Sequence, residues 1–222
     1  MESAQKAFTR IYREHTWGGT FKSGPGSDPE LLRAYSTLLA DVLTERQVHS
    51  VVDVGCGDWA LGRTLDWSGV DYTGLDIVPD VVENLNVNFR SNSIRFCCLD
   101  VVSDALPQAD LCIIKDVLQH LSNNSVRSLL GRLNNYFAAA LITNDLSHSK
   151  QGNWRTLWKT ESISPNTEIP EGGYRPLRLR EPPFNLRAKQ LLIMSLRFER
   201  LVFDHPGAVY ETKEVLLWER EK

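Results

Sequence analysis

The sequence predicts a doubly wound α/β domain on a mostly parallel, seven-stranded sheet whose last strand is antiparallel. The 222 residues, 42% apolar and 24% charged, suffice for one sizeable core but are few for two ordinary domains. Through the centre of the chain, short apolar runs alternate with longer amphipathic segments, as in repeated strand–helix units. Near the C-terminus two strand-like runs follow each other with no helix between them, which favours an antiparallel pair at one sheet edge.

The expected elements can be justified in order. Residues 27–43 predict a helix, because Ser27 or Asp28 can cap it, Pro29 suits its first turn and apolar residues recur at helical spacing. Further helices are expected over residues 59–66, 79–89 and 123–136. The parallel strands are predicted at five short apolar runs: His49–Val54, Tyr72–Leu75, Ile94–Leu99, Leu111–Ile114 and Ala139–Thr143. The antiparallel pair is expected near Leu201 and Leu216.

The first strand leads directly into a Gly-x-Gly turn and a helix start, within the string VVDVGCGDWA over residues 51–60. This is the geometry of a nucleotide site: Gly55 permits the tight turn, and Gly57 lets the backbone approach a ligand closely. Gly55-x-Gly57-x-x-Ala60 also matches the dinucleotide fingerprint, with Asp76 placed to bind a ribose hydroxyl. Glycine spacing alone therefore leaves two kinds of ligand open.

Charge separates these two ligands. Asp53 and Asp58 flank the glycines. Their carboxylates would repel the pyrophosphate of a dinucleotide but would attract the ammonium and sulfonium groups of S-adenosylmethionine. The turn therefore favours the cationic ligand.

This segment resembles motif I of the class I S-adenosylmethionine-dependent methyltransferases, and the resemblance extends over about residues 27–145. It implies a Rossmann-like fold in which Asp76, followed by Ile77, binds the ribose, and in which Asp100 and Val101 recognise the adenine. The string IIKDVLQHLS resembles the family's fourth-strand motif, which implies that Lys115, Asp116, Gln119 and His120 face cofactor and acceptor. Trp59 stands where the family has a third glycine, so we expect its indole to wall the methionine end.

Aspartates stand at or just past the carboxyl ends of all five predicted parallel strands: Asp53, Asp76, Asp100, Asp116 and Asp145. In an open parallel sheet these ends form the ligand crevice. An Asp in any one of these places could simply cap a helix, but five in register favour a site.

A hydroxyl acceptor needs a base, and we expect His120 to serve, with Asp116 and Asp145 as alternatives. An ordinary histidine pKa would make turnover rise near neutrality. Asp116, Asn144 and Asp145 could instead supply oxygen ligands to Mg²⁺, but Asp–Asn pairs commonly form turns, so no metal ligand is assigned.

Two glycine-punctuated segments, residues 12–26 and 144–185, fall outside the sheet pattern. We expect Tyr12 and Trp17 in the first, and Tyr174 and Arg175 in the second, to bind the acceptor; surface loops are the alternative. The chain is thus divided into a lid and helix (1–48), a cofactor-binding core (49–145), a substrate lid (146–187) and a C-terminal helix and strand pair (188–222).

A net charge of −3 offers no basic field for nucleic acid, and no apolar run approaches the roughly 20 residues that cross a bilayer. The polar N-terminal residues and four cysteines without metal-ligand spacing favour a cytoplasmic protein with reduced thiols. A monomer or homodimer is expected.

The sequence therefore predicts methyl transfer from S-adenosylmethionine to a small molecule, preferentially to a hydroxyl of a sugar or secondary metabolite. Amine and carboxylate acceptors remain alternatives. So do two other classes of protein, an NAD-dependent oxidoreductase and a non-catalytic S-adenosylmethionine-binding protein.

Overall fold

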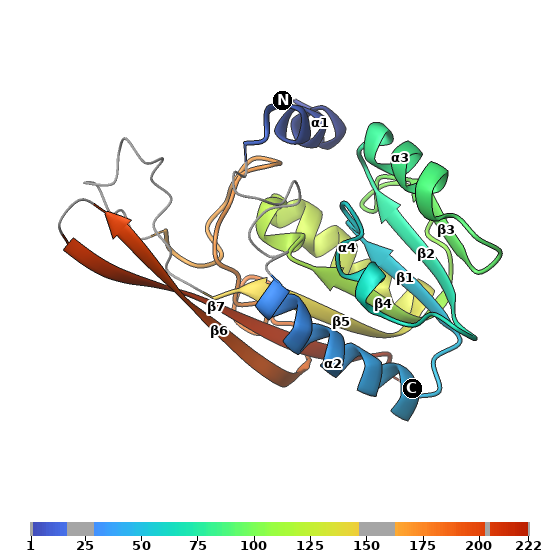
Figure 1. Ribbon diagram of the computed structural model, residues 1–222. Coiled ribbons are helices and arrows are strands. Elements are labelled where there is room, and N and C mark those ends of the chain that lie inside the picture. The colour runs from blue at the N-terminus through green and yellow to red at the C-terminus, as the bar shows by residue number, and fades with distance from the viewer. Residues whose placement is uncertain (1, 17–28, 147–162, 203–204, 222) are drawn as a thin grey trace.

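The computed structural model describes residues 2–16, 29–146, 163–202 and 205–221, which fold around one seven-stranded sheet (Figure 1). The strands lie in the order β3-β2-β1-β4-β5-β7-β6. Their bounds are β1 Ser50–Val54, β2 Asp71–Asp76, β3 Ile94–Cys98, β4 Ala109–Lys115, β5 Phe137–Asp145, β6 Lys189–Val202 and β7 His205–Glu219. None of the helices in these residues has the length and apolar character required to span a membrane.

The first five strands run parallel, and β7 pairs antiparallel with both β5 and β6. The expected fold class is confirmed, and the strand order reverses between β1 and β4. Ligands of open α/β sheets bind at such a reversal, outside the carboxyl ends of the strands.

Helices cover both faces of the sheet. On one face α2 (Pro29–Glu45) and α3 (Pro79–Phe89) share an apolar cluster with β1 and β2. On the other face α4 (Asn123–Tyr136) buries Val126, Leu129 and Leu133 at helical spacing. Figure 1 shows α2 and α4 on opposite sides of the strands and α1 (Ala4–Glu14) beyond the edge where the parallel strands end.

Three elements differ from expectation. The helix expected over residues 59–66 is a set of turns with one short 3₁₀ helix, η2 (Gly62–Thr64), because Trp59 has a left-handed φ of 60° that no right-handed helix contains. Helix α1 was not expected at all. The C-terminal helix expected in residues 188–222 is wrong: the described residues there form the strands β6 and β7.

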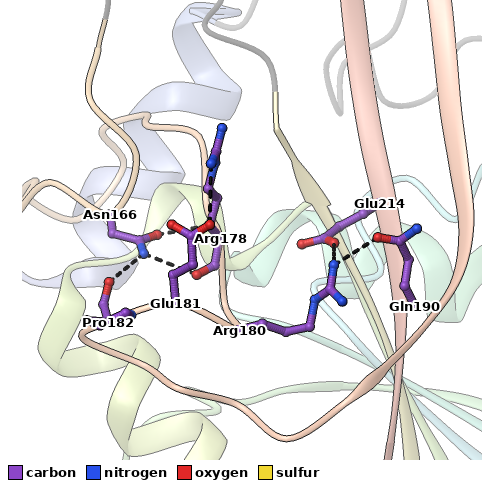
Figure 2. A network of polar contacts seen from close by, with 7 residues as sticks. All are labelled: Asn166, Arg178, Arg180, Glu181, Pro182, Gln190 and Glu214. Atoms are coloured by element: carbon purple, nitrogen blue, oxygen red, sulfur yellow. Dashed lines mark hydrogen bonds and ion pairs between the residues drawn. The ribbon is translucent and has the colours of Figure 1, made fainter.

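Residues 163–188 form an irregular segment, called the strap below, that lies against η3 (Leu118–His120), α4 and the β6–β7 pair. Its own side chains Leu177 and Leu179 are fully buried. Figure 2 shows how its polar side chains fix it: Asn166 bonds the backbone of Arg178 and Pro182, and Arg180 reaches Gln190 and Glu214. The strap is therefore a packed part of the fold.

Candidate active site

A cleft of about 1040 Å³, its open mouth included, lies over the carboxyl ends of β1, β2 and β4. Helix α1 covers part of it, with Ala4, Phe8 and Tyr12 one turn apart on the face that lines the cleft. Most of the residues expected to bind the cofactor line this cleft: Asp53, Gly55, Gly57, Asp58, Asp76, Ile77, Asp100, Val101, Lys115 and Asp116.

The glycine turn is built at the end of β1. Gly55 has a left-handed φ of 67°, and its N–H donates to the Leu75 carbonyl oxygen over 2.8 Å, which joins the turn to β2. A Cβ at Gly55 would lie 2.4 Å from Cγ2 of Val117, so this position has no room for a side chain. Conformation and space both require glycine here.

Asp76 lies at the end of β2 and is nearly buried, yet it still lines the cleft. Its Oδ2 accepts a hydrogen bond from the Gly57 N–H over 3.1 Å, and its Oδ1 accepts one from the Val78 N–H over 3.0 Å. Burial raises the pKa of Asp76, and these backbone donors oppose the rise. Because a carboxylate has about four acceptor sites, Asp76 can still accept from a ligand hydroxyl.

Asp53 points from β1 into the polar floor of the cleft. Its Oδ2 accepts a hydrogen bond from the Tyr72 hydroxyl over 2.6 Å. Burial raises the pKa of Asp53 to about 7, against the opposing effects of Tyr72 and Lys115. The carboxyl is thus poised to ionise fully when a cation binds beside it.

Two further aspartates line the cleft through local turns. Asp58 accepts from the Ala60 N–H over 3.2 Å, and Asp100 accepts from the Val102 N–H over 2.9 Å. Ile77 and Val101 line the cleft next to Asp76 and Asp100 and provide apolar surface for a planar ring.

Asp116 follows β4 in a left-handed conformation, with φ 59°. Its two oxygens each accept from a lysine: Nζ of Lys115 and Nζ of Lys213, both over 2.6 Å. Burial alone would raise the pKa of Asp116, but the two ammonium groups outweigh it and hold the pKa well below its usual range. A carboxylate stabilised in this way is a poor proton acceptor.

His120 ends η3 and lines the cleft. Its Nδ1 lies 2.8 Å from the Gly173 carbonyl oxygen in the strap. Burial lowers the pKa of His120 to about 4, against the opposing effect of the Gly173 carbonyl. The imidazole is therefore neutral across the physiological range.

Asp145 and Tyr174 lie behind His120. The Tyr174 hydroxyl donates to Oδ2 of Asp145 over 2.5 Å, and its ring centroid lies 5.9 Å from that of His120. Asp145 is buried and takes no part in lining the cleft. Among the strand-end residues, His120 thus has the geometry of a base toward a cleft ligand, and Asp145 does not.

Comparison with known proteins identifies the family. A model of the O-methyltransferase domain matches residues 3–141, more than half of the chain. The chain belongs to the O-methyltransferase domain family. It is an S-adenosylmethionine-dependent methyltransferase with the class I fold, and the dinucleotide interpretation of the glycine turn is set aside.

Individual relatives of this methyltransferase are distant. The malonyl-[acyl-carrier protein] O-methyltransferase of Acetivibrio thermocellus is 33% identical over 72 residues, which are 31% of this chain and 25% of that protein. The match thus spans about a quarter of that curated relative.

Two solved structures show the same fold. The N-methyltransferase NodS of Bradyrhizobium japonicum WM9, in complex with S-adenosyl-L-homocysteine, has a TM-score of 0.61 at 13% identity over the full length of both chains. Human N-acetylserotonin methyltransferase, in complex with S-adenosylmethionine, has a TM-score of 0.61 at 22% identity and covers 100% of this chain and 61% of that one.

Four residues expected in the methyltransferase site do not line the cleft: Asp145 and Tyr174, which bond each other behind His120, and Trp59 and Arg175. The Trp59 indole does not wall the cleft: its left-handed backbone turns it into the core among Tyr72, Phe89 and Phe96. Arg175 does not face an acceptor, because its side chain is fully buried between η3 and α4. Trp17 lies outside the described residues, whereas Tyr12 lines the cleft.

The oxygen set considered for Mg²⁺ does not form. Asn144 and Asp145 are neighbours on β5, so their side chains point to opposite faces of the sheet, and the oxygens of Asp116 are bonded to lysines. Within the described ranges, no three His, Cys, Asp or Glu side chains gather in a way that could hold a metal ion.

Sequence reasoning missed two contributors to the methyltransferase cleft. Ala4, Phe8 and Tyr12 recur every four residues, a helical spacing that could have predicted α1. Lys213 is a lone cation beside the apolar run of β7, and its role became visible only when β7 placed it against Asp116. A lysine next to an apolar strand run can be buried, and a buried lysine needs an anionic partner. The sequence carried no other signal for this contact.

Proposed function

We propose that this methyltransferase transfers the methyl group of S-adenosylmethionine to a hydroxyl of a small molecule, with His120 as the base. The observation that carries the proposal is that His120 lines the cleft as a neutral imidazole with Nδ1 on a carbonyl oxygen. A carbonyl oxygen can only accept, so Nδ1 carries the hydrogen and Nε2 is the nitrogen that accepts a proton.

The cofactor would occupy the part of the cleft over β1 and β2. There Asp76 would accept from the ribose hydroxyls, Asp100 would accept from the adenine amino group, and Ile77 and Val101 would pack on the ring. Asp53 and Asp58 would face the cationic end. S-adenosylmethionine supplies an activated methyl group, which needs no further activation by the protein.

The protein must still align the acceptor, remove its proton and exclude water. A base with a pKa of about 4 does not ionise an alcohol in advance. The hydroxyl proton therefore passes to Nε2 of His120 while the oxygen's electron pair forms the new bond to carbon and the carbon–sulfur bond breaks. Phe8 and Tyr12 on α1 line the cleft and are the aromatic side chains that would orient a ring-shaped acceptor.

The test is a screen of pooled small-molecule acceptors with radiolabelled methyl donor, followed by identification of the methylated atom. With a hydroxyl acceptor, His120→Asn should lower kcat by roughly 100-fold or more with cofactor affinity nearly unchanged. His49→Asn is the matched control, because His49 is exposed next to the other end of β1. A methylated amine or carboxylate, or full turnover of His120→Asn, would overturn the proposal.

A further inference from the structure

The strap holds His120 from two sides. The Gly172 N–H donates to the His120 carbonyl oxygen over 2.8 Å, and the Gly173 carbonyl oxygen accepts from Nδ1 over 2.8 Å. Together the two glycines fix both the backbone and the ring of one residue. The tautomer of His120 therefore depends on where the strap places Gly173.

Arg175, two residues further along, anchors this part of the strap. Its side chain is fully buried. Nη1 donates to the Leu118 carbonyl oxygen over 2.8 Å, and Nη2 donates to Oδ1 of Asn123 over 3.0 Å. Its backbone N–H donates to the Gln119 carbonyl oxygen over 3.2 Å. These bonds tie Arg175 to the two residues that precede His120 and to the first residue of α4.

Two carboxylates of the strap complete the anchor. Glu168 accepts from the Asn123 N–H over 3.2 Å, and Glu171 accepts from the Ser125 hydroxyl over 2.6 Å. Burial lowers the pKa of Arg175 to about 10, while the charges of Glu168 and Glu171 oppose this, so the guanidinium stays charged near neutrality. A buried cation is costly even when paired, and an apolar side chain would fill the space at less cost. The guanidinium instead provides fixed geometry, because its planar donors hold the Leu118 carbonyl and the Asn123 side chain at the same time.

We propose that Arg175 is a positioning residue for His120: it locks the strap to η3 and so holds the Gly173 carbonyl against Nδ1, which leaves Nε2 to take the acceptor's proton. This inference rests on the proposed role of His120 as the base. Arg175 was expected to bind the acceptor. In this proposal it instead determines which ring nitrogen of His120 carries the hydrogen.

The test reads the tautomer directly and needs no acceptor. With ¹⁵N-labelled histidine, long-range ¹H–¹⁵N NMR spectra distinguish the two neutral tautomers, and the His120→Asn spectrum assigns the His120 signals among the five histidines. The wild-type protein should show the Nδ1–H form alone. Arg175→Gln should show a mixture with the Nε2–H form and, once an acceptor is known, a kcat at least tenfold lower with an unchanged KM for S-adenosylmethionine.

Arg178→Gln is the matched control on the same strap. The Arg178 guanidinium donates to the exposed carboxylate of Glu181 and lies outside the anchor (Figure 2), so this variant should keep the Nδ1–H form. If Arg175→Gln fails to fold, Arg175→Lys takes its place. One ammonium group cannot reach both the Leu118 carbonyl oxygen and Oδ1 of Asn123, so this variant should also show the Nε2–H tautomer.

A folded Arg175 variant that keeps the pure Nδ1–H form would overturn the inference. The outcome for the proposed function is separate: full turnover of His120→Asn would remove the base role, whatever the tautomer of the wild-type ring.

Discussion

The Tyr72 hydroxyl on β2 donates a hydrogen bond to Oδ2 of Asp53 on β1, over 2.6 Å, beneath the cleft. Tyr72 is fully buried and Asp53 nearly so. The Asp53 carboxyl of this pair is only partly ionised at neutral pH, because burial raises its pKa to about 7. Its ionisation should therefore report the charge of a bound ligand.

Binding of S-adenosylmethionine should release a proton near pH 7. The pKa of Asp53 is raised to about 7, so about half of the molecules carry its proton, and a cation nearby lowers that pKa. Titration calorimetry in buffers of different ionisation enthalpy measures the release. S-adenosylhomocysteine, without the sulfonium charge, should release less, and Asp53→Asn should release none. Equal release by wild type and Asp53→Asn would place the titrating group elsewhere.

Asp76→Ala should weaken binding of S-adenosylmethionine by about 2 to 4 kcal/mol, because a charged acceptor for two ribose hydroxyls is lost. Calorimetry gives the affinity. Asp71→Ala is the control, since Asp71 is exposed at the opposite end of the same strand. Wild-type affinity in Asp76→Ala would contradict the placement of the ribose over β2.

Gly55→Ala should lower the free energy of unfolding by about 1 to 3 kcal/mol more than Gly69→Ala does. Both glycines have a left-handed φ, 67° and 79°, but only Gly55 has a neighbour, Cγ2 of Val117, in the path of a Cβ. Urea unfolding measures both variants. Adding Val117→Ala should relieve part of the Gly55→Ala cost, and equal costs at the two glycines would mean that the close approach to Val117 is unimportant.

His120 should make the protein less stable in acid. Its pKa is lowered to about 4 in the folded protein but is about 6.5 in an unfolded chain, so the unfolded state binds the extra proton as the pH falls from 6.5 toward 4. This lowers the free energy of unfolding by about 2 kcal/mol from pH 7 to pH 5.

Asp53 acts in the opposite direction over the same range, because its raised pKa lets the folded state bind the extra proton below pH 7. The measurement is therefore a difference: urea unfolding of wild type and His120→Asn at both pH values. The free energy of unfolding of His120→Asn, relative to that of wild type, should rise by about 2 kcal/mol between pH 7 and pH 5. A pH-independent difference would show that His120 titrates alike in both states.

Trp59→Ala should cost stability and spare the ligand. The indole packs against three aromatic rings, so its removal should lower the free energy of unfolding by about 3 to 5 kcal/mol. The affinity for S-adenosylmethionine, measured below the unfolding transition, should stay near that of wild type. If Trp59→Ala lost affinity for S-adenosylmethionine but kept its stability, the indole would have to contact the ligand and not the core.

The sequence by itself determined the strands and the places where they end. Buried parallel strands need runs of apolar residues, and the turn after β1 needs glycine, so both leave local signals that a reader can recognise. Because the carboxyl ends of parallel strands meet at one edge, the positions of Asp53, Asp76 and Asp100 followed from those signals. The family resemblance carried by the same residues agrees with the match over residues 3–141.

The tertiary structure alone decided which way individual side chains face. Trp59 and Arg175 each follow a glycine by two residues, yet Trp59 packs in an aromatic core and Arg175 in a buried anchor. Lys213 lies 97 residues from Asp116 and meets it only because β7 enters the sheet beside β5. Such contacts depend on the free energy of burial and charge pairing between distant segments, which local spacing does not contain.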